Sequence, residues 1–266
     1  MAKAHFRLES VSMKKNEYKR LYDELNDPKD IDRVAEKTGL DKELILVLYT
    51  QKTVRTATRR FYKVKHRAKA LLKKWNEGRT FLSLSNELRF PPILTAYLIL
   101  LENNITRKRF WELVKNPERI KDNRLRKEIS QVVKKDIVYS PEGNEMQYAR
   151  GKRGEKMLCE WLDKQELKYQ TEEQLKSKHQ KTPDTLLSKP LQTNGMNIKW
   201  IESKASFGDE VEIRRNTKRQ LKAYTELFGQ GMVVYWFGFI DSVHPPKNVL
   251  IVDSSFFEKD LEISRR

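Results

Sequence analysis

The spacing of apolar residues changes near Ser140, and this change constrains the fold more than any other feature of the chain. Before it, apolar side chains recur every three or four residues, as in amphipathic helices. After Gly143 one more helical pattern, Glu145–Lys164, is followed by segments with the period of two that is typical of strands. A chain of 266 residues has room for two domains. We therefore expect an α+β protein with an all-α region, 1–140, and a mixed α/β domain, 141–266.

Two segments of the first region have the pattern of a helix-turn-helix unit. In one, the helical segment Asp30–Lys37 is followed by a glycine turn and by a second helix that Asp41 would cap. In the other, Leu82–Leu101, a helix ends before two prolines that suit the first turn of the next helix. A tandem pair would bind nucleic acid through its second helices, while a plain helical scaffold is the alternative reading. Further helices are expected at Thr106–Lys115 and Pro117–Lys135.

In the second region, strand patterns surround a helical one. The helix is expected at Glu212–Phe228, closed by Gly229. The expected strands are Leu167–Glu172, Thr185–Leu187, Asn197–Ala205, Met232–Ile240 and Asn248–Val252. This order predicts a central mixed sheet covered by helices.

Basic residues are concentrated in the first region. It holds 33 Lys and Arg against 18 Asp and Glu, whereas the second holds 21 against 19. The densest run, Gln51–Lys74, contains ten bases and no acid, which favours contact with nucleic acid over an ordinary solvated helix face. The residues expected to make this contact are Lys52, Arg55, Arg59, Arg60, Lys63 and Arg67.

The remaining composition excludes several classes of site. Cys159 is the only cysteine, which rules out an internal disulfide and a cysteine-rich zinc site and favours a reducing, intracellular location. The longest apolar run, Pro91–Leu101, is shorter than the ~18 residues that a membrane span needs, so no membrane association is expected. No metal-ligand spacing relates the four histidines, His5, His66, His179 and His244.

Two acidic residues lie where a pair of expected strands would bring them together. Asp184 precedes one strand, and Glu202 lies on the next with Lys204 two positions later, so that Glu202 and Lys204 share a face. Two carboxylates form a hard-oxygen site suited to Mg²⁺ or Mn²⁺, and a neighbouring lysine can orient water or stabilise charge in phosphodiester hydrolysis. The alternatives are a turn role for Asp184 and a structural ion pair for Lys204.

These motifs, Pro183-Asp184 and Glu202-Ser203-Lys204, resemble those of the PD-(D/E)XK nuclease superfamily. The longer strings KTPDTLL, WIESKASFGDE and QLKAYTELFGQGMVVYWFGFID are similar to the TPD family of archaeal and eukaryotic proteins. The resemblance implies a restriction-endonuclease-like second domain, and the first region agrees with that family's paired helix-turn-helix region. It also implies two further site residues, Glu155 as a third acid and Gln220 on the later helix. Otherwise Glu155 pairs with a neighbouring lysine, and Gln220 bridges strand and helix.

The leading hypothesis is a Mg²⁺- or Mn²⁺-dependent nuclease that acts on DNA, with structure-specific roles in repair or replication. Asp184 and Glu202 would bind the metal together with Glu155 and Ser203, while Lys204 positions the water and Gln220 orients the site. Two alternatives stay open: a non-catalytic DNA-binding or adaptor protein with a nuclease-like fold, and a nuclease directed at RNA.

Two expectations concern partners and location. A homodimer is expected from other nucleases of this fold, although no interface is legible. The resemblance implies a codanin-like partner if the source is a eukaryote. It also implies a cytoplasmic location in an archaeon, and a nuclear or cytoplasmic one in a eukaryote.

Overall fold

The computed structural model of the protein describes residues 12–177 and 180–258, so that His5 and His179 lie outside the described residues. Contacts divide the chain into two compact units. The sheet unit comprises the described parts of 1–48 and 150–266, and the helical unit comprises 49–149. The division expected at Ser140 gave each of the two regions its own function, and this division stays a prediction.

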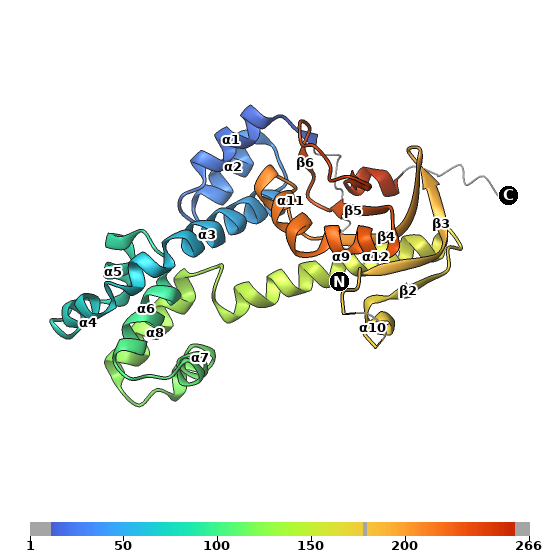
Figure 1. Ribbon diagram of the computed structural model, residues 1–266. Helices are drawn as coiled ribbons and strands as arrows, with labels where there is room; N and C mark the ends of the chain where they lie inside the picture. Colours follow the sequence, from blue (N-terminus) through green and yellow to red (C-terminus); the bar gives the residue numbers. More distant parts are fainter. Residues whose placement is uncertain (1–11, 178–179, 259–266) are drawn as a thin grey trace, which may run out of the picture. The chain divides into compact units, whose positions relative to one another are not determined.

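The helical unit is built from short helices around one apolar core. Phe81, Ile93, Phe110 and Ile129 are fully buried at its centre. Its elements are most of α3 (Lys42–Lys65), then α4 (Ala68–Asn76), α5 (Phe81–Leu88), α6 (Pro92–Glu102), α7 (Arg107–Lys115), η1 (Pro117–Arg119), α8 (Asn123–Lys135) and the start of α9 (Pro141–Lys164) (Figure 1). The helices expected between Thr106 and Lys135 are therefore confirmed, except that residues 120–122 interrupt the second.

A buried carboxylate on α8 joins three helices of this unit. Glu128 accepts hydrogen bonds from Trp75 Nε1 at 3.1 Å and from the backbone N–H of Phe81 at 3.0 Å, and it pairs with Arg124 at 2.9 Å. Because a buried carboxylate needs donors to offset its lost hydration, these contacts fix the packing of α4, α5 and α8.

Both expected helix-turn-helix patterns form helix pairs. In the first, α2 (Asp30–Thr38) ends at Gly39 with φ 71°, and the Asp41 carboxylate accepts from the N–H groups of Glu43 and Leu44 at the start of α3. In the second, α5 and α6 are joined through Arg89, whose φ is 46°. The first pair begins in the sheet unit and the second lies in the helical unit. Their contact with DNA stays a prediction.

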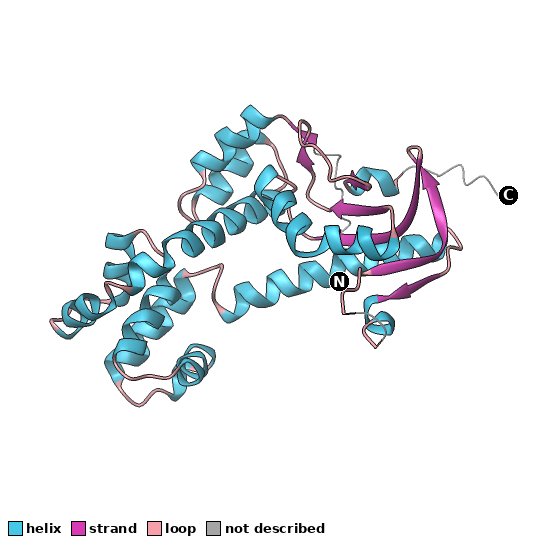
Figure 2. Cartoon of the chain, in the orientation of Figure 1, coloured by secondary structure: helices cyan, strands magenta, loops and turns pink. Residues whose placement is uncertain are grey.

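The sheet unit contains a five-stranded mixed sheet in the order β2-β3-β4-β5-β7. Its strands are β2 (Tyr169–Thr171), β3 (Thr185–Thr193), β4 (Met196–Lys204), β5 (Gly231–Tyr235) and β7 (Val249–Val252). The pairs β2–β3 and β3–β4 are antiparallel, whereas β4–β5 and β5–β7 are parallel. The expected central mixed sheet is confirmed, and the protein is α+β (Figure 2).

The other elements of the sheet unit are short. A two-stranded parallel sheet joins β1 (Ser12–Met13) to β6 (Phe239–Ile240). The helices are α1 (Lys15–Glu24), α2, α10 (Glu172–Leu175), α11 (Glu210–Asn216), the π-helical turn η2 (Thr217–Leu221), α12 (Lys222–Phe228) and η3 (Ser254–Phe257). Within residues 12–177 and 180–258, no helix combines the length and apolarity that crossing a bilayer requires.

Helices lie against both faces of the central strand β4. On one face, Trp200 packs against Leu221 and Tyr224, which come from η2 and α12. On the other face, Ser203 lies next to Gly154 of α9. Because successive side chains of a strand point to opposite faces, η2 with α12 and α9 cover opposite sides of β4.

Three expected boundaries were wrong for local reasons. The strand expected at Met232–Ile240 ends at Tyr235, since Gly238 with φ 85° turns the chain so that Phe239–Ile240 pairs with β1. The helix expected from Glu145 already begins at Pro141, because Ser140 Oγ accepts from the N–H of Gly143 and caps it.

The strand expected at Thr185–Leu187 instead continues to Thr193. Pro190 is tolerated because, among the described residues, β2 pairs only with residues 185–187 and the register between β3 and β4 shifts between Leu186 and Leu191.

Candidate active site

Asp184 and Glu202 meet at the start of β3. Thr185 pairs with Ile201 in the sheet, which sets Asp184 beside Glu202. The Asp184 N–H donates to Glu202 Oε2 at 3.2 Å, and the Ser203 N–H donates to Asp184 Oδ2 at 2.7 Å. The expectation that these two acids come together is therefore confirmed as geometry, while their roles stay predictions.

Lys204 connects the acids to the later helix. Its Nζ lies 2.5 Å from Glu202 Oε1 and 2.8 Å from Gln220 Oε1, so the shared face of Glu202 and Lys204 is confirmed. Gln220 lies in the π-helical turn η2, which interrupts the helix expected at Glu212–Phe228. A π turn inserts one extra residue into a helix and changes which side chains face inward, and such turns are frequent at functional sites.

The electrostatic state of the two acids is unusual. Glu202 is only 2% exposed, and burial raises its pKa against the opposing effect of Lys204. Burial also raises the pKa of Asp184, and the neighbouring Glu202 carboxylate raises it further. Each carboxyl loses hydration and Asp184 faces a like charge, so two simultaneous negative charges are unfavourable without an added cation.

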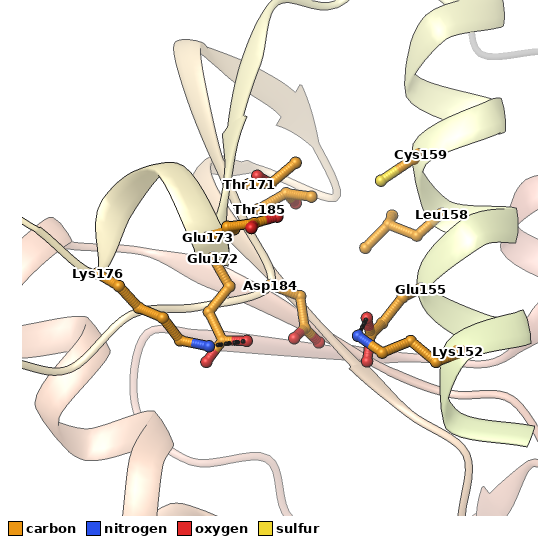
Figure 3. A pocket seen from close by; sticks show the side chains of 10 residues that line it. All are labelled: Lys152, Glu155, Leu158, Cys159, Thr171, Glu172, Glu173, Lys176, Asp184 and Thr185. Atoms are coloured by element: carbon orange, nitrogen blue, oxygen red, sulfur yellow. Dashed lines mark hydrogen bonds and ion pairs between the residues drawn. The ribbon is translucent and has the colours of Figure 1, made fainter. Parts of the chain in front are cut away.

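A cavity of about 490 Å³ opens on one side of Asp184. Its walls come from α9, from α10 and from the ends of β2 and β3 (Figure 3). In the close view Asp184 stands between two ion pairs, Lys152–Glu155 and Lys176–Glu172. The residues that line it are Lys152, Glu155, Leu158, Cys159, Thr171, Glu172, Glu173, Lys176, Asp184 and Thr185.

Glu155 pairs with a neighbouring lysine and also lines the cavity beside Asp184. Its Oε2 accepts from Lys152 Nζ at 2.7 Å, as a solvated helix face would arrange it. It also lines the cavity with Asp184, and its charge contributes to the raised pKa of Asp184. A role in chemistry stays a prediction.

The sequence reasoning missed Glu172 and Tyr224. The Glu172 N–H donates to the Asp184 carbonyl oxygen at 3.0 Å, and the Glu172 side chain lines the cavity. The Tyr224 hydroxyl donates to the Thr182 carbonyl oxygen at 2.8 Å and so fixes the loop before Asp184. A capping box between Thr171 and Gln174 starts α10 and is legible in the sequence, but its nearness to Asp184 depends on strand pairing.

Ser203 reaches the acids through its backbone alone. Its hydroxyl oxygen accepts from Trp236 Nε1 at 2.7 Å, on the face of β4 opposite to Glu202 and Lys204. Only the Ser203 N–H contacts Asp184. The side chain is thus not brought to the carboxylates, and its place among the metal ligands stays a prediction.

The donor set fits a hard divalent cation. Asp184 and Glu202 supply carboxylate oxygens, and a cation would offset the charge that burial disfavours. Within the described part of the chain, no group of three or more His, Cys, Asp or Glu side chains is arranged to hold a metal ion. Mg²⁺ commonly binds through one or two carboxylates with water and substrate phosphate, so two are sufficient.

The six bases expected to contact nucleic acid all belong to the helical unit. Arg59, Lys63 and Arg67 are exposed. Arg60 instead donates to the carbonyl oxygens of Leu88 and Arg89 at 2.6 and 2.7 Å, which closes the end of α5. Lys52 and Arg55 are half-buried.

The excess of Lys and Arg over Asp and Glu is confined to part of the first region. Residues 51–140 hold 23 Lys and Arg against 8 Asp and Glu, whereas residues 1–50 hold ten of each. The surplus therefore belongs to the helical unit rather than to the helices that join the sheet unit. Binding of nucleic acid stays a prediction.

Comparisons with known proteins match residues 121–255 to one family. The profile of a family described as "Protein of unknown function TPD sequence-motif" matches residues 121–255. CDAN1-interacting nuclease 1 of Homo sapiens is 35% identical over 170 residues, 61% of this chain and 60% of the human protein. The Mus musculus protein of that name is 32% identical over 188 residues, 68% and 67% of the two chains. The chain therefore spans about three fifths of the human relative's length, and no solved structure matches it.

Proposed function

Because the chain belongs to the TPD family, we propose that it is a metal-dependent nuclease that cuts DNA. The observation that carries the proposal is the contact of Asp184, Glu202 and Lys204 at the start of β3, where burial raises the pKa of both acids. A PD-(D/E)XK layout for the sheet unit is part of the same proposal. The animal relatives are themselves named nucleases, which supports it.

The proposal assigns a task to each residue of the site. Asp184 and Glu202 would hold Mg²⁺ or Mn²⁺, with Glu155 approaching from the other side of the cavity. The bound cation would polarise a phosphodiester oxygen and acidify water. The Lys204 ammonium, held between Glu202 and Gln220, would donate to the attacking water or to the oxygen that gains charge.

DNA is the proposed substrate because of the charge of the helical unit. Its excess of Lys and Arg attracts polyanions, and contact with phosphates would release condensed counterions. Phosphate contacts do not separate DNA from RNA, so RNA is an outcome of the test rather than a second proposal. A partner comparable to CDAN1 is proposed from the relatives' name and is tested by binding of purified CDAN1. A homodimer stays a prediction, which sedimentation analysis would test.

The test is cleavage of a labelled panel of single strand, duplex, flap, four-way junction and RNA with Mg²⁺, Mn²⁺ or EDTA. Lys204→Met removes the ammonium, and Lys199→Met is the matched control, since Lys199 is an exposed lysine on the same strand. We expect cutting that needs metal, falls about 100-fold or more in Lys204→Met and persists in Lys199→Met. Cleavage in EDTA, or equal cleavage by both variants, contradicts the proposal. Binding without cutting throughout the panel favours the non-catalytic reading.

A further inference from the structure

Helix α9 lies close to Ser203 of β4 and to Trp236 at Gly154. A Cβ at this position would lie 2.6 Å from Trp236 Nε1, 2.7 Å from Trp236 Cδ1 and 3.0 Å from Ser203 Oγ. Glycine is the least favourable residue in a helix interior apart from proline, yet Gly154 lies well inside the 24-residue α9. Helix formation does not explain a glycine at this position, whereas the close contact with Trp236 and Ser203 does.

Gly154 lies against the side chains of Trp236 and Ser203, and the backbone of Ser203 is bonded to Asp184. Trp236 Nε1 donates to Ser203 Oγ at 2.7 Å, and the Ser203 N–H donates to Asp184 Oδ2 at 2.7 Å. Trp236 is only 3% exposed and stacks on Phe257 with 5.0 Å between ring centroids. The indole is therefore buried and packed against Phe257, which leaves little free space into which it could move.

Glu155 follows Gly154 directly and faces Asp184 across the cavity (Figure 3). Asp184 precedes β3 and is linked to β4 by the Ser203 N–H, so a shift of α9 against β4 would move Glu155 relative to Asp184. We propose that Gly154 is a positioning residue, whose lack of a side chain seats α9 on the Trp236–Ser203 pair and so holds Glu155 opposite Asp184. The effect on cleavage rests on the proposed nuclease function, whereas the seating of α9 does not.

Any side chain at position 154 would have to displace one of these elements. Ordinary van der Waals contact begins near 3.4 Å, so an alanine would require a shift of about 0.8 Å in α9 or in the indole. A shift of about 1 Å at a catalytic group can lower a rate by about 100-fold. Substrate binding depends on other contacts and would be affected less.

The test compares Gly154→Ala with Gly151→Ala. Gly151 lies on the same helix, and a Cβ there meets nothing within 4 Å, so it controls for the helix propensity of alanine. We expect kcat to fall about 10- to 100-fold in Gly154→Ala with KM within about twofold, and both constants to stay within about twofold in Gly151→Ala. Equal kcat in the two variants overturns the proposal.

Two further readouts separate positioning from a general loss of structure. The Trp236 indole N–H resonance, assigned by its loss in Trp236→Leu, should shift in Gly154→Ala and not in Gly151→Ala. In the Trp236→Leu background, where the obstructing ring is absent, Gly154→Ala should lower kcat less than about twofold. An unmoved resonance, or an undiminished effect in that background, contradicts the contact mechanism.

The experiments distinguish failure of the nuclease proposal from failure of the Gly154 proposal. If the intact protein cuts no substrate, the nuclease function fails, and the indole resonance alone decides whether Gly154 seats α9. If Gly154→Ala does not fold, folding of the double variant Gly154→Ala with Trp236→Leu supports the contact, and failure of the double variant overturns it.

Discussion

Replacing Lys204 by methionine should destabilise the metal-free protein in a pH-dependent way. Lys204 Nζ lies 2.5 Å from Glu202 Oε1, and the Glu202 side chain is only 3% exposed. Methionine keeps most of the apolar stem and removes the charge, which leaves the Glu202 carboxylate buried beside Asp184 without its partner. Breaking a buried ion pair in this way typically costs about 3 to 5 kcal/mol.

Protonation of Glu202 sets an upper limit to this loss. A carboxyl group with an ordinary pKa of about 4.3 takes up a proton at a cost of 1.36 kcal/mol per pH unit, about 4 kcal/mol at pH 7.5 and about 1 kcal/mol at pH 5. Burial raises the pKa of Glu202, so the folded variant binds the proton more tightly than the unfolded chain does. The loss should therefore be small at low pH and grow as pH rises, to about 3 kcal/mol at pH 7.5.

The assay is urea unfolding in EDTA at pH 5 and pH 7.5, followed by tryptophan fluorescence. The double variant Glu202→Gln with Lys204→Met removes both charges and should recover most of the stability at pH 7.5. A loss that is equal at both pH values, or below about 0.5 kcal/mol at pH 7.5, refutes the reasoning, because it would mean that the Glu202 carboxylate does not depend on Lys204.

Three more outcomes follow from the structure. Asp184→Asn should raise the urea midpoint of the EDTA-treated protein at pH 8 but not at pH 4. Burial and Glu202 raise the pKa of Asp184, so ionised Asp184 destabilises the folded protein as pH rises, and asparagine removes that charge. Replacing Arg59, Lys63 and Arg67 by glutamine should weaken DNA binding and reduce its salt slope by about 0.9 per lost phosphate contact, and an unchanged slope would place binding elsewhere. Glu128→Ala should cost about 3 kcal/mol in urea unfolding, since Trp75 Nε1 and the Phe81 N–H lose their acceptor; a loss below about 1 kcal/mol would contradict this.

The strand motif of the site could be predicted because it depends on local geometry. A period of two fixes that Glu202 and Lys204 share a face, and their 2.5 Å contact follows from it. The turn after Pro183 placed Asp184 at the start of a strand, and antiparallel pairing with β4 completed the arrangement. The helix ends at Gly39 and Asp41 were legible for the same reason, since caps need particular residues.

Features that depend on tertiary packing could not be predicted. Glu172 reaches Asp184 only because β2 pairs with β3, and no local pattern encodes that pairing. Arg60 looked like its basic neighbours on α3, but the carbonyl groups that it binds lie 28 and 29 residues away. The apolar run from Met232 concealed a turn, because Trp236 and Phe237 are buried although they lie outside the strand.

The most direct test of the central claim is a calorimetric titration of the metal-free protein with Mn²⁺ at pH 7.5. Asp184→Asn and Glu202→Gln are the variants to compare, since each keeps the shape of its side chain and removes one charge. The account predicts that the intact protein binds the ion and gains thermal stability with its concentration, and that both variants lose this binding. Equal binding by the intact protein and both variants would contradict the assignment of Asp184 and Glu202 as the residues that hold the cation.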